Sequence, residues 1–264
     1  MRAPSITSSA AGAARGMAEP RGLGRQPMDR RGFLRMGGAS IAGALLAATG
    51  CDSQGPAAAQ PLLRLAERGN EHVERLLFRH RAGDRVPAGA RLAGDAFPRY
   101  FISDRVPVWD AQANGIWRLE VAGAVRRPLS LTLGDLMQLP RTTQRVDHYC
   151  VEGWTARAEW AGVRASDLAR LAGATSDAQF VDFQSFDDGY HESWDMASAM
   201  HRQTLVAYAM DGRMLSAGHG APARLHSPVK LGYKCTKYLT RVVFLPTRNG
   251  GYWSDRGYEW YAGT

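Results

Sequence analysis

The chain has 264 residues, a hydrophobic content of 45% and a formal net charge of +8, with a sequence pI of about 9.7. This length is typical of one large domain, or of one domain with a tail, and the apolar fraction suffices for a packed core. Residues 1–50 carry seven of the 33 basic and two of the 25 acidic residues, so the remainder has a net charge of only +3. No basic stripe interleaved with aromatic residues survives outside this leader, and the composition therefore excludes nucleic acid as a partner.

The leader carries the features of an export signal. Residues 29–35 read Asp-Arg-Arg-Gly-Phe-Leu-Arg and resemble the twin-arginine signal. The apolar run that follows, residues 41–48, has the length of a signal h-region and is too short for a typical membrane span. Because the twin-arginine route exports folded proteins, often with a cofactor inserted, this resemblance favours a metalloenzyme outside the cytoplasm, in the periplasm.

Two processing sites are compatible with the end of the leader. Ala48-Thr49-Gly50-Cys51 resembles a lipobox, in which Cys51 would be lipidated and would anchor the protein to the membrane. The alternative is ordinary cleavage near Ala57-Ala58-Ala59, an A-x-A type site. We therefore expect a signal peptide over residues 1–50, with either a lipid anchor or a free mature N-terminus.

The segment between leader and domain has mixed character. Residues 52–61 are small and polar, as in a linker, and residues 62–80 carry apolar positions that predict a helix interrupted at Gly69-Asn70. Residues 81–98 are rich in Gly, Pro and Arg, which predicts an extended wrapping segment. The expected organisation is thus a linker and wrapping segment over 51–95 and a globular domain over 96–264.

The globular part is predicted to be a strand-dominated, mixed α+β domain. Thr132 is expected to cap a short helix that Pro140 stops, and Ser166 is expected to cap a second helix that ends at Gly173. Alternating apolar residues predict strands over residues 116–121, 129–133, 143–150, 180–186, 204–210, 223–227 and 238–245.

Three cysteines occur, at positions 51, 150 and 235. The absence of C-x-x-C and C-x-x-C-H spacings excludes zinc-ribbon, c-type haem and iron–sulfur sites. Two alternatives remain for Cys150 without a metal: a buried free thiol, or a disulfide with Cys235 in a non-enzymatic exported lipoprotein with a binding role.

Cys150 also begins the segment Cys150-Val151-Glu152-Gly153-Trp154. This segment resembles the Cys-Val-Glu-x-Trp motif of the sulfite-oxidase family, in its periplasmic methionine-sulfoxide reductase branch. Residues 96–245 resemble the molybdopterin-binding domain of that family. The resemblance implies that Cys150 is the catalytic metal ligand, the one protein thiolate on the molybdenum of a molybdopterin cofactor. A soft metal held by a dithiolene suits a further sulfur donor.

Other family positions that contact the cofactor can be matched in chain order. His219 stands where that branch has Asn and other branches have His. Arg224 is expected to pair with the pterin phosphate through its planar guanidinium. By resemblance, the remaining cofactor contacts are Arg99, Tyr100, Phe101, Ser185, Lys234, Cys235, Thr236 and Lys237.

The resemblance implies a two-electron oxygen-atom transfer on a small molecule, with an organic sulfoxide as the preferred substrate. The carboxylate of Glu152 would oppose a sulfite dianion, while Trp154 offers an aromatic wall. The alternative is oxidation of the sulfite dehydrogenase type. Because no haem motif is present, electrons are expected to come from a separate cytochrome, membrane b-type or soluble c-type. The family's C-terminal dimerisation domain is missing, so we expect a monomer. Residues 62–95 and 250–264 are not explained by the resemblance.

Overall fold

The structure is a computed structural model that describes residues 59–77 and 97–264. The predicted export signal and lipobox, and nearly all of the predicted wrapping segment, lie outside the described residues. Within the described ranges, no helix combines the length and the apolar content needed to cross a membrane.

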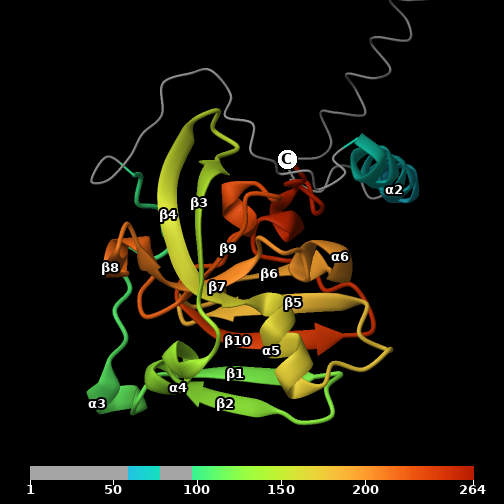
Figure 1. The fold of residues 1–264 in the computed structure, drawn as a ribbon. Coiled ribbons are helices and arrows are strands. Elements are labelled where there is room, and N and C mark those ends of the chain that lie inside the picture. Colours follow the sequence, from blue (N-terminus) through green and yellow to red (C-terminus); the bar gives the residue numbers. More distant parts are fainter. Residues whose placement is uncertain (1–58, 78–96) are drawn as a thin grey trace, which may run out of the picture. The chain divides into compact units, whose positions relative to one another are not determined.

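Two five-stranded sheets form the domain (Figure 1). In the first sheet β1 and β10 pair in parallel, and the other neighbouring strands are antiparallel. Its strand order is β2 (Leu129–Thr132), β1 (Arg118–Gly123), β10 (Leu239–Leu245), β5 (Phe180–Ser185) and β6 (His191–Asp195). The second is antiparallel and contains β3 (Thr142–Tyr149), β4 (Thr155–Arg164), β7 (Leu205–Met210), β8 (Arg213–Met214) and β9 (Arg224–His226). The predicted strand-dominated α+β class is confirmed.

The main core is built from the inward faces of both sheets. In β1, Leu119 and Val121 are fully buried while Arg118 and Glu120 are exposed, as expected when one face of a strand meets a core. They share one apolar cluster with Phe244 of β10 and Val163 of β4. Full burial of such a side chain contributes about 1.5–3 kcal/mol, so this cluster fixes the sheets that carry the site.

The helices on these sheets confirm one predicted cap and correct another. Helix α4 (Leu133–Gln138) has Thr132 as its N-cap, in a capping box with Asp135. Helix α5 (Ala165–Ala172) ends at Gly173 in the left-handed conformation, as predicted. The prediction that Ser166 caps this helix is wrong. The chain passes directly from β4 into α5, and the Ala165 N–H donates to the carbonyl of Thr204, just before β7, at 3.0 Å.

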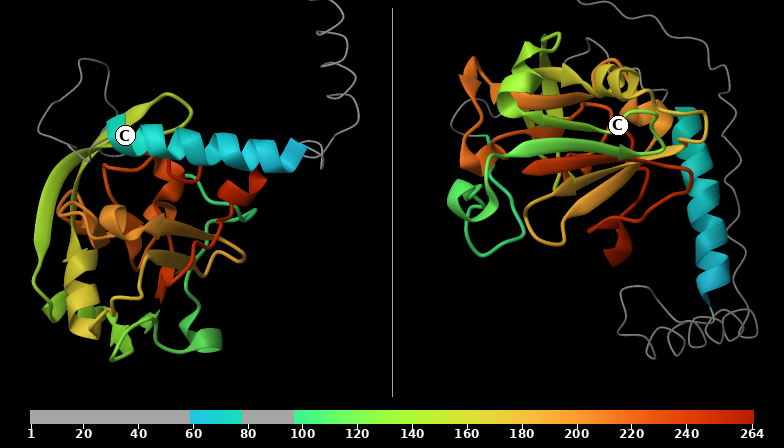
Figure 2. Two further views of the ribbon diagram at one scale, coloured as in Figure 1. Left: turned by 90° about the vertical axis from the view of Figure 1, so that its right-hand side faces the viewer. Right: turned by 90° about the horizontal axis from the view of Figure 1, so that it is seen from below.

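Helix α2 (Gln60–Leu77) begins inside the predicted linker and continues through Gly69-Asn70, where an interruption was predicted; Figure 2 shows it as one uninterrupted helix. A glycine inside a helix costs only about 1 kcal/mol relative to alanine. Asn70 instead extends its amide to Glu74, 3.4 Å away on the next turn. The shorter elements are helices α3 (Ala111–Asn114) and α6 (Met196–Ala199), and the 3-10 turns η3 (Ala217–His219), η4 (Gly232–Lys234) and η5 (Ser254–Arg256).

Candidate active site

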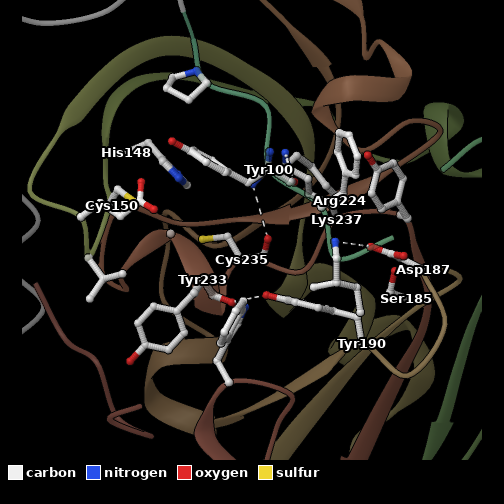
Figure 3. A pocket seen from close by; sticks show the side chains of 18 of the residues that line it. Tyr100, His148, Cys150, Ser185, Asp187, Tyr190, Arg224, Tyr233, Cys235 and Lys237 are labelled. Atoms are coloured by element: carbon white, nitrogen blue, oxygen red, sulfur yellow. Dashed lines mark hydrogen bonds between the residues drawn. The ribbon is translucent and has the colours of Figure 1, made fainter. Parts of the chain in front are cut away.

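A cavity of about 310 Å³ opens at the end of β3. Its walls come from segments far apart in the sequence: the stretch before α3, the β3–β4 turn, the β5–β6 turn, β9 with η4, and the C-terminal segment (Figure 3). Within these segments the lining residues fall at 97–102, 148–154, 185–190, 224–238 and 253–258.

Cys150 is held at the rim of this cavity by its own turn. Its N–H donates to the Trp154 carbonyl at 3.0 Å, and its carbonyl accepts from Gly153, which has a φ of 87°. Two residues earlier, His148 lies on the same side of the chain, because side chains alternate along a strand. Both cavity cysteines, Cys150 and Cys235, are free thiols, so the alternative of a disulfide between them is not supported.

A carboxylate lies beside the Cys150 sulfur. Glu152 Oε2 is 4.0 Å from Cys150 Sγ and accepts a hydrogen bond from Trp154 Nε1 at 3.0 Å. Burial raises the pKa of the Cys150 thiol, and the charge of Glu152 raises it further. The protein alone therefore keeps this thiol protonated. A bound metal ion would have to displace the proton to gain a thiolate ligand.

Two cations lie on the opposite part of the cavity wall without a carboxylate partner among the described residues. The Arg224 side chain is 1% exposed, and its guanidinium donates to the carbonyls of Leu225, His219 and Cys235 at 3.2–3.4 Å. Lys237 Nζ donates to the carbonyls of Tyr100 and Gly218 at 2.6 and 3.1 Å. Burial, followed by the charge of Arg224, lowers the pKa of Lys237 to about 6. An anion bound between these two cations would favour their charged forms and would raise the pKa of Lys237 again.

Buried polar atoms near these cations also have unused hydrogen-bonding capacity. The Nδ1 atom of His148 and the hydroxyl of Tyr238 have no hydrogen-bond partner within the described structure, although both residues line the cavity. A Cβ on Gly232 would lie 2.5 Å from His148 Nε2, so only glycine permits this close approach. Unpaired buried donors and cations are costly unless a ligand satisfies them. A polar, anionic cofactor next to the sulfur of Cys150 fits these residues.

Aromatic rings form the mouth of the cavity. Tyr100 stacks on Trp154 with ring centroids 6.0 Å apart. On the C-terminal side, Tyr258 packs edge-on against Tyr233 at 5.3 Å and tilted against Trp253 at 5.0 Å. These rings offer broad apolar contact near the Cys150 sulfur, together with a few polar groups at their edges.

Most of the predicted site residues meet at the cavity, and four do not. Those that line it are Tyr100, Phe101, Cys150, Ser185, Arg224, Cys235 and Lys237. Arg99 lies against Gly218 instead. The His219 ring packs edge-on against Phe97 at 5.6 Å, and burial, with the nearby Arg224, lowers its pKa to about 4.

Lys234 and Thr236 do not line the cavity, and their expected contact with the cofactor stays a prediction. The Lys234 ammonium is fully buried and pairs with Glu192 at 2.5 Å. The Thr236 hydroxyl donates to the Phe183 carbonyl at 3.3 Å. Both side chains fasten the η4 loop to the first sheet, and so support its position without lining the cavity.

Sequence reasoning missed several cavity residues. His148 could have been found, because a strand with Cys150 on its cavity side must present His148 there as well. Asp187 accepts from the Ile102 N–H at 3.1 Å and from the Ser103 hydroxyl, and so ties the segment before α3 to the β5–β6 turn. No local pattern predicted that contact, because the partners are more than 80 residues apart.

Comparison with known proteins identifies the family. Residues 105–253 match the family described as oxidoreductase molybdopterin binding domain. The chain is 37% identical over 236 residues to the putative protein-methionine-sulfoxide reductase subunit YedZ1 of Azospira oryzae, covering 89% of this chain and 88% of that protein. It is 31% identical over 176 residues to the uncharacterized oxidoreductase YuiH of Bacillus subtilis, covering 66% and 86%.

A further relative is the catalytic subunit MsrP of a protein-methionine-sulfoxide reductase from Campylobacter jejuni, 29% identical over 155 residues, with 53% of this chain and 52% of that protein covered. The family match spans more than half of the chain, and the YedZ1 similarity spans most of both proteins. The resemblance to the sulfite-oxidase family is thereby confirmed. The chain belongs to the oxidoreductase molybdopterin-binding domain family: it is an enzyme, a molybdopterin oxidoreductase whose cofactor carries molybdenum.

Proposed function

We propose that this enzyme reduces an organic sulfoxide of the methionine-sulfoxide class to the thioether. The observation that carries the proposal is the aromatic mouth around Cys150 and Glu152. A neutral thioether sulfoxide gains apolar contact from these rings, whereas the Glu152 carboxylate repels a sulfite dianion. The names of two relatives, a putative methionine-sulfoxide reductase subunit and a methionine-sulfoxide reductase catalytic subunit, support the same substrate class.

We assign the cofactor-binding roles from the cavity geometry. Cys150 supplies the thiolate to the metal, and Arg224 with Lys237 neutralises the pterin phosphate. Phe101, Ser185 and Cys235 border the same space. When bound, the cofactor supplies the exchange of an oxygen atom and two electrons, which no side chain of the cavity can perform.

The reduction consumes two electrons and two protons, and it releases the thioether and one water molecule. The Tyr100 hydroxyl is placed to hold a proton for this step, with the Glu152 carboxylate as its hydrogen-bond acceptor. The hydrogen bond to Glu152, followed by burial, raises the pKa of the Tyr100 phenol, so the hydroxyl stays protonated at neutral pH. Trp154 fixes the carboxylate through its indole N–H at 3.0 Å. A proton can thus pass from the Tyr100 hydroxyl, which the Glu152 carboxylate orients, to the departing oxygen.

The proposed cellular setting follows from the leader. We propose that residues 1–50 direct export by the twin-arginine route, that residues 51–95 link the leader to a domain over 96–264, and that the enzyme works in the periplasm. We further propose a cytochrome, membrane b-type or soluble c-type, as the electron donor. Lipidation of Cys51 and a monomeric state remain predictions of the sequence.

The test compares substrates on holoenzyme purified after export. With reduced benzyl viologen as the donor, methionine sulfoxide and dimethyl sulfoxide should be reduced. With ferricyanide as the acceptor, sulfite should be oxidised far more slowly. The Glu152→Gln variant should lose sulfoxide turnover, and a surface control, Glu120→Gln on β1, should keep it. Fast sulfite oxidation without sulfoxide reduction would replace this proposal by the sulfite dehydrogenase alternative.

A further inference from the structure

Helix α2 is amphipathic, and it presents its apolar side to the outside. Its six large apolar residues are all exposed, between 46% and 69%: Leu62, Leu63, Leu65, Val73, Leu76 and Leu77. Its half-buried residues are all polar: Gln60, Glu67, Glu71, Glu74 and Arg75. A helix that covers a core has the opposite arrangement. Hydrophobic burial against this domain therefore does not explain the leucines of α2.

Polar contacts fasten the inner side of α2 to the domain. Arg248, just after β10, pairs with Glu67 at 2.6 Å and Glu71 at 3.2 Å. Arg75 pairs with Asp195 at 3.4 Å, and its guanidinium lies 4.6 Å from the ring centre of Tyr261. This set of contacts orients the helix about its axis, so that the apolar stripe points away from the domain.

The outer side of α2 has the chemistry of a lipid-contacting surface. At 100° per residue, Leu62, Leu65, Val73 and Leu76 fall on one stripe about 21 Å long. The exposed side chain of Arg68 flanks this stripe. The cores of protein–protein interfaces are enriched in aromatic residues and Arg, and the stripe contains neither. Binding to a bilayer surface requires only apolar area with a basic flank.

The length of the chain between Cys51 and α2 also favours contact of the stripe with a membrane. Residues 1–58 precede the described part of the chain, and Cys51 stands nine residues before Gln60. Nine residues extend at most about 30 Å, so a chain held at a membrane near Cys51 would keep α2 within reach of that membrane. We propose that α2 is an interfacial helix, which lies in the surface of an anionic membrane and carries the enzyme domain on its polar side.

The test measures partition of the full-length holoenzyme into vesicles. Cys51→Ser is present in every sample, so that lipidation cannot produce binding. The vesicles contain phosphatidylethanolamine and phosphatidylglycerol, with phosphatidylcholine vesicles as the uncharged comparison. One variant combines Leu65→Gln, Val73→Gln and Leu76→Gln. The matched control replaces apolar residues that are equally exposed outside α2: Val108→Gln, Ile116→Gln and Met137→Gln.

We expect the parent and the control to float with the anionic vesicles, and the α2 variant to partition at least about tenfold less. Hydrogen exchange within residues 60–77 should slow when vesicles are added to the parent. Equal melting temperature and equal molybdenum content in all three proteins would show that the domain is intact. Equal flotation of the α2 variant and the parent would overturn the proposal. Two other results would also overturn the proposal if the parent protein does not bind vesicles. One is a dimer that forms only when the apolar residues of α2 are present. The other is protection of the α2 stripe from exchange by residues 78–96 of the same chain.

Discussion

Replacing Arg224 with alanine should weaken cofactor binding far more than it weakens the fold. This guanidinium is buried against three carbonyls and lies 4.9 Å from the Trp160 ring centre, and no carboxylate of residues 59–77 or 97–264 pairs with it. The apo form thus carries an uncompensated charge, which the pterin phosphate would neutralise. A hydrogen bond to a charged group contributes about 1.5–3 kcal/mol. The expected loss in cofactor affinity is therefore roughly tenfold to a hundredfold.

The assay is molybdenum and pterin content per protein, measured under limiting cofactor, with a thermal melt of the apo form alongside. Arg224→Lys should retain an intermediate occupancy, because an ammonium supplies charge without the planar, two-pronged geometry. Arg241→Ala on β10, whose side chain is 47% exposed, is the control and should keep full occupancy. Unchanged occupancy in Arg224→Ala would refute the assignment of this residue to the phosphate.

Three further changes test the metal ligand, the leader and an ion pair. Cys150→Ser should abolish turnover, measured as viologen oxidation with sulfoxide, because a serine hydroxyl is a harder and far less acidic donor than a thiol. Arg30→Lys with Arg31→Lys should leave the protein in the cytoplasmic fraction of the host, on immunoblots. The Asp182 carboxylate, 2.9 Å from His191 Nδ1, raises the pKa of that imidazole. This stabilisation is present below the unfolded pKa of about 6.5 and is lost as pH rises through the folded value. Melts across that range should therefore show a decline that His191→Gln lacks.

Part of the fold could be read from local pattern. β1, β5 and β10 alternate apolar and polar residues with enough aromatic and branched side chains to predict strands. β4 was missed because four of its six buried positions are alanine or glycine, which have little strand preference. β6 was missed because its sequence, His-Glu-Ser-Trp-Asp, is polar, yet four of its five residues are buried. Ion pairs with distant residues make that burial possible, and no local pattern predicts them.

The site shows the same division. The position of Cys150, after a strand and before a turn, was predictable from a short motif. The direction of Lys234 was not, because its neighbours Cys235 and Lys237 do line the cavity. Its partner Glu192 lies 42 residues earlier. The ammonium group of a loop lysine can pair with a ligand phosphate or with a buried carboxylate, and only the tertiary structure shows which partner is within reach.

That buried pair leads to a prediction about the C-terminal segment. Glu192 is fully buried, and its carboxylate accepts from Lys234 Nζ, from Ser254 Oγ at 3.0 Å and from the Trp253 N–H at 2.9 Å. A Cβ on Gly251 would lie 2.3 Å from Glu192 Oε2, so the segment passes directly over this group. Glu192 thereby fixes the loop that presents Trp253 to the cavity.

Glu192→Gln keeps the shape of the side chain but leaves the Lys234 ammonium buried without a counter-charge. Removing one member of a buried pair costs about 3–5 kcal/mol, so the melting temperature should fall by roughly 10 °C. The KM for sulfoxide should rise while molybdenum content stays constant, because the amide has one acceptor oxygen where the carboxylate has two, and the loop at the mouth loses one of its two hydrogen bonds to residue 192. Adding Lys234→Met removes the unpaired charge and should restore most of the melting temperature, but not the KM. If Glu192→Gln alone has the melting temperature and the KM of the parent, Glu192 does not position this wall. Trp253 would then be held by its neighbouring rings alone.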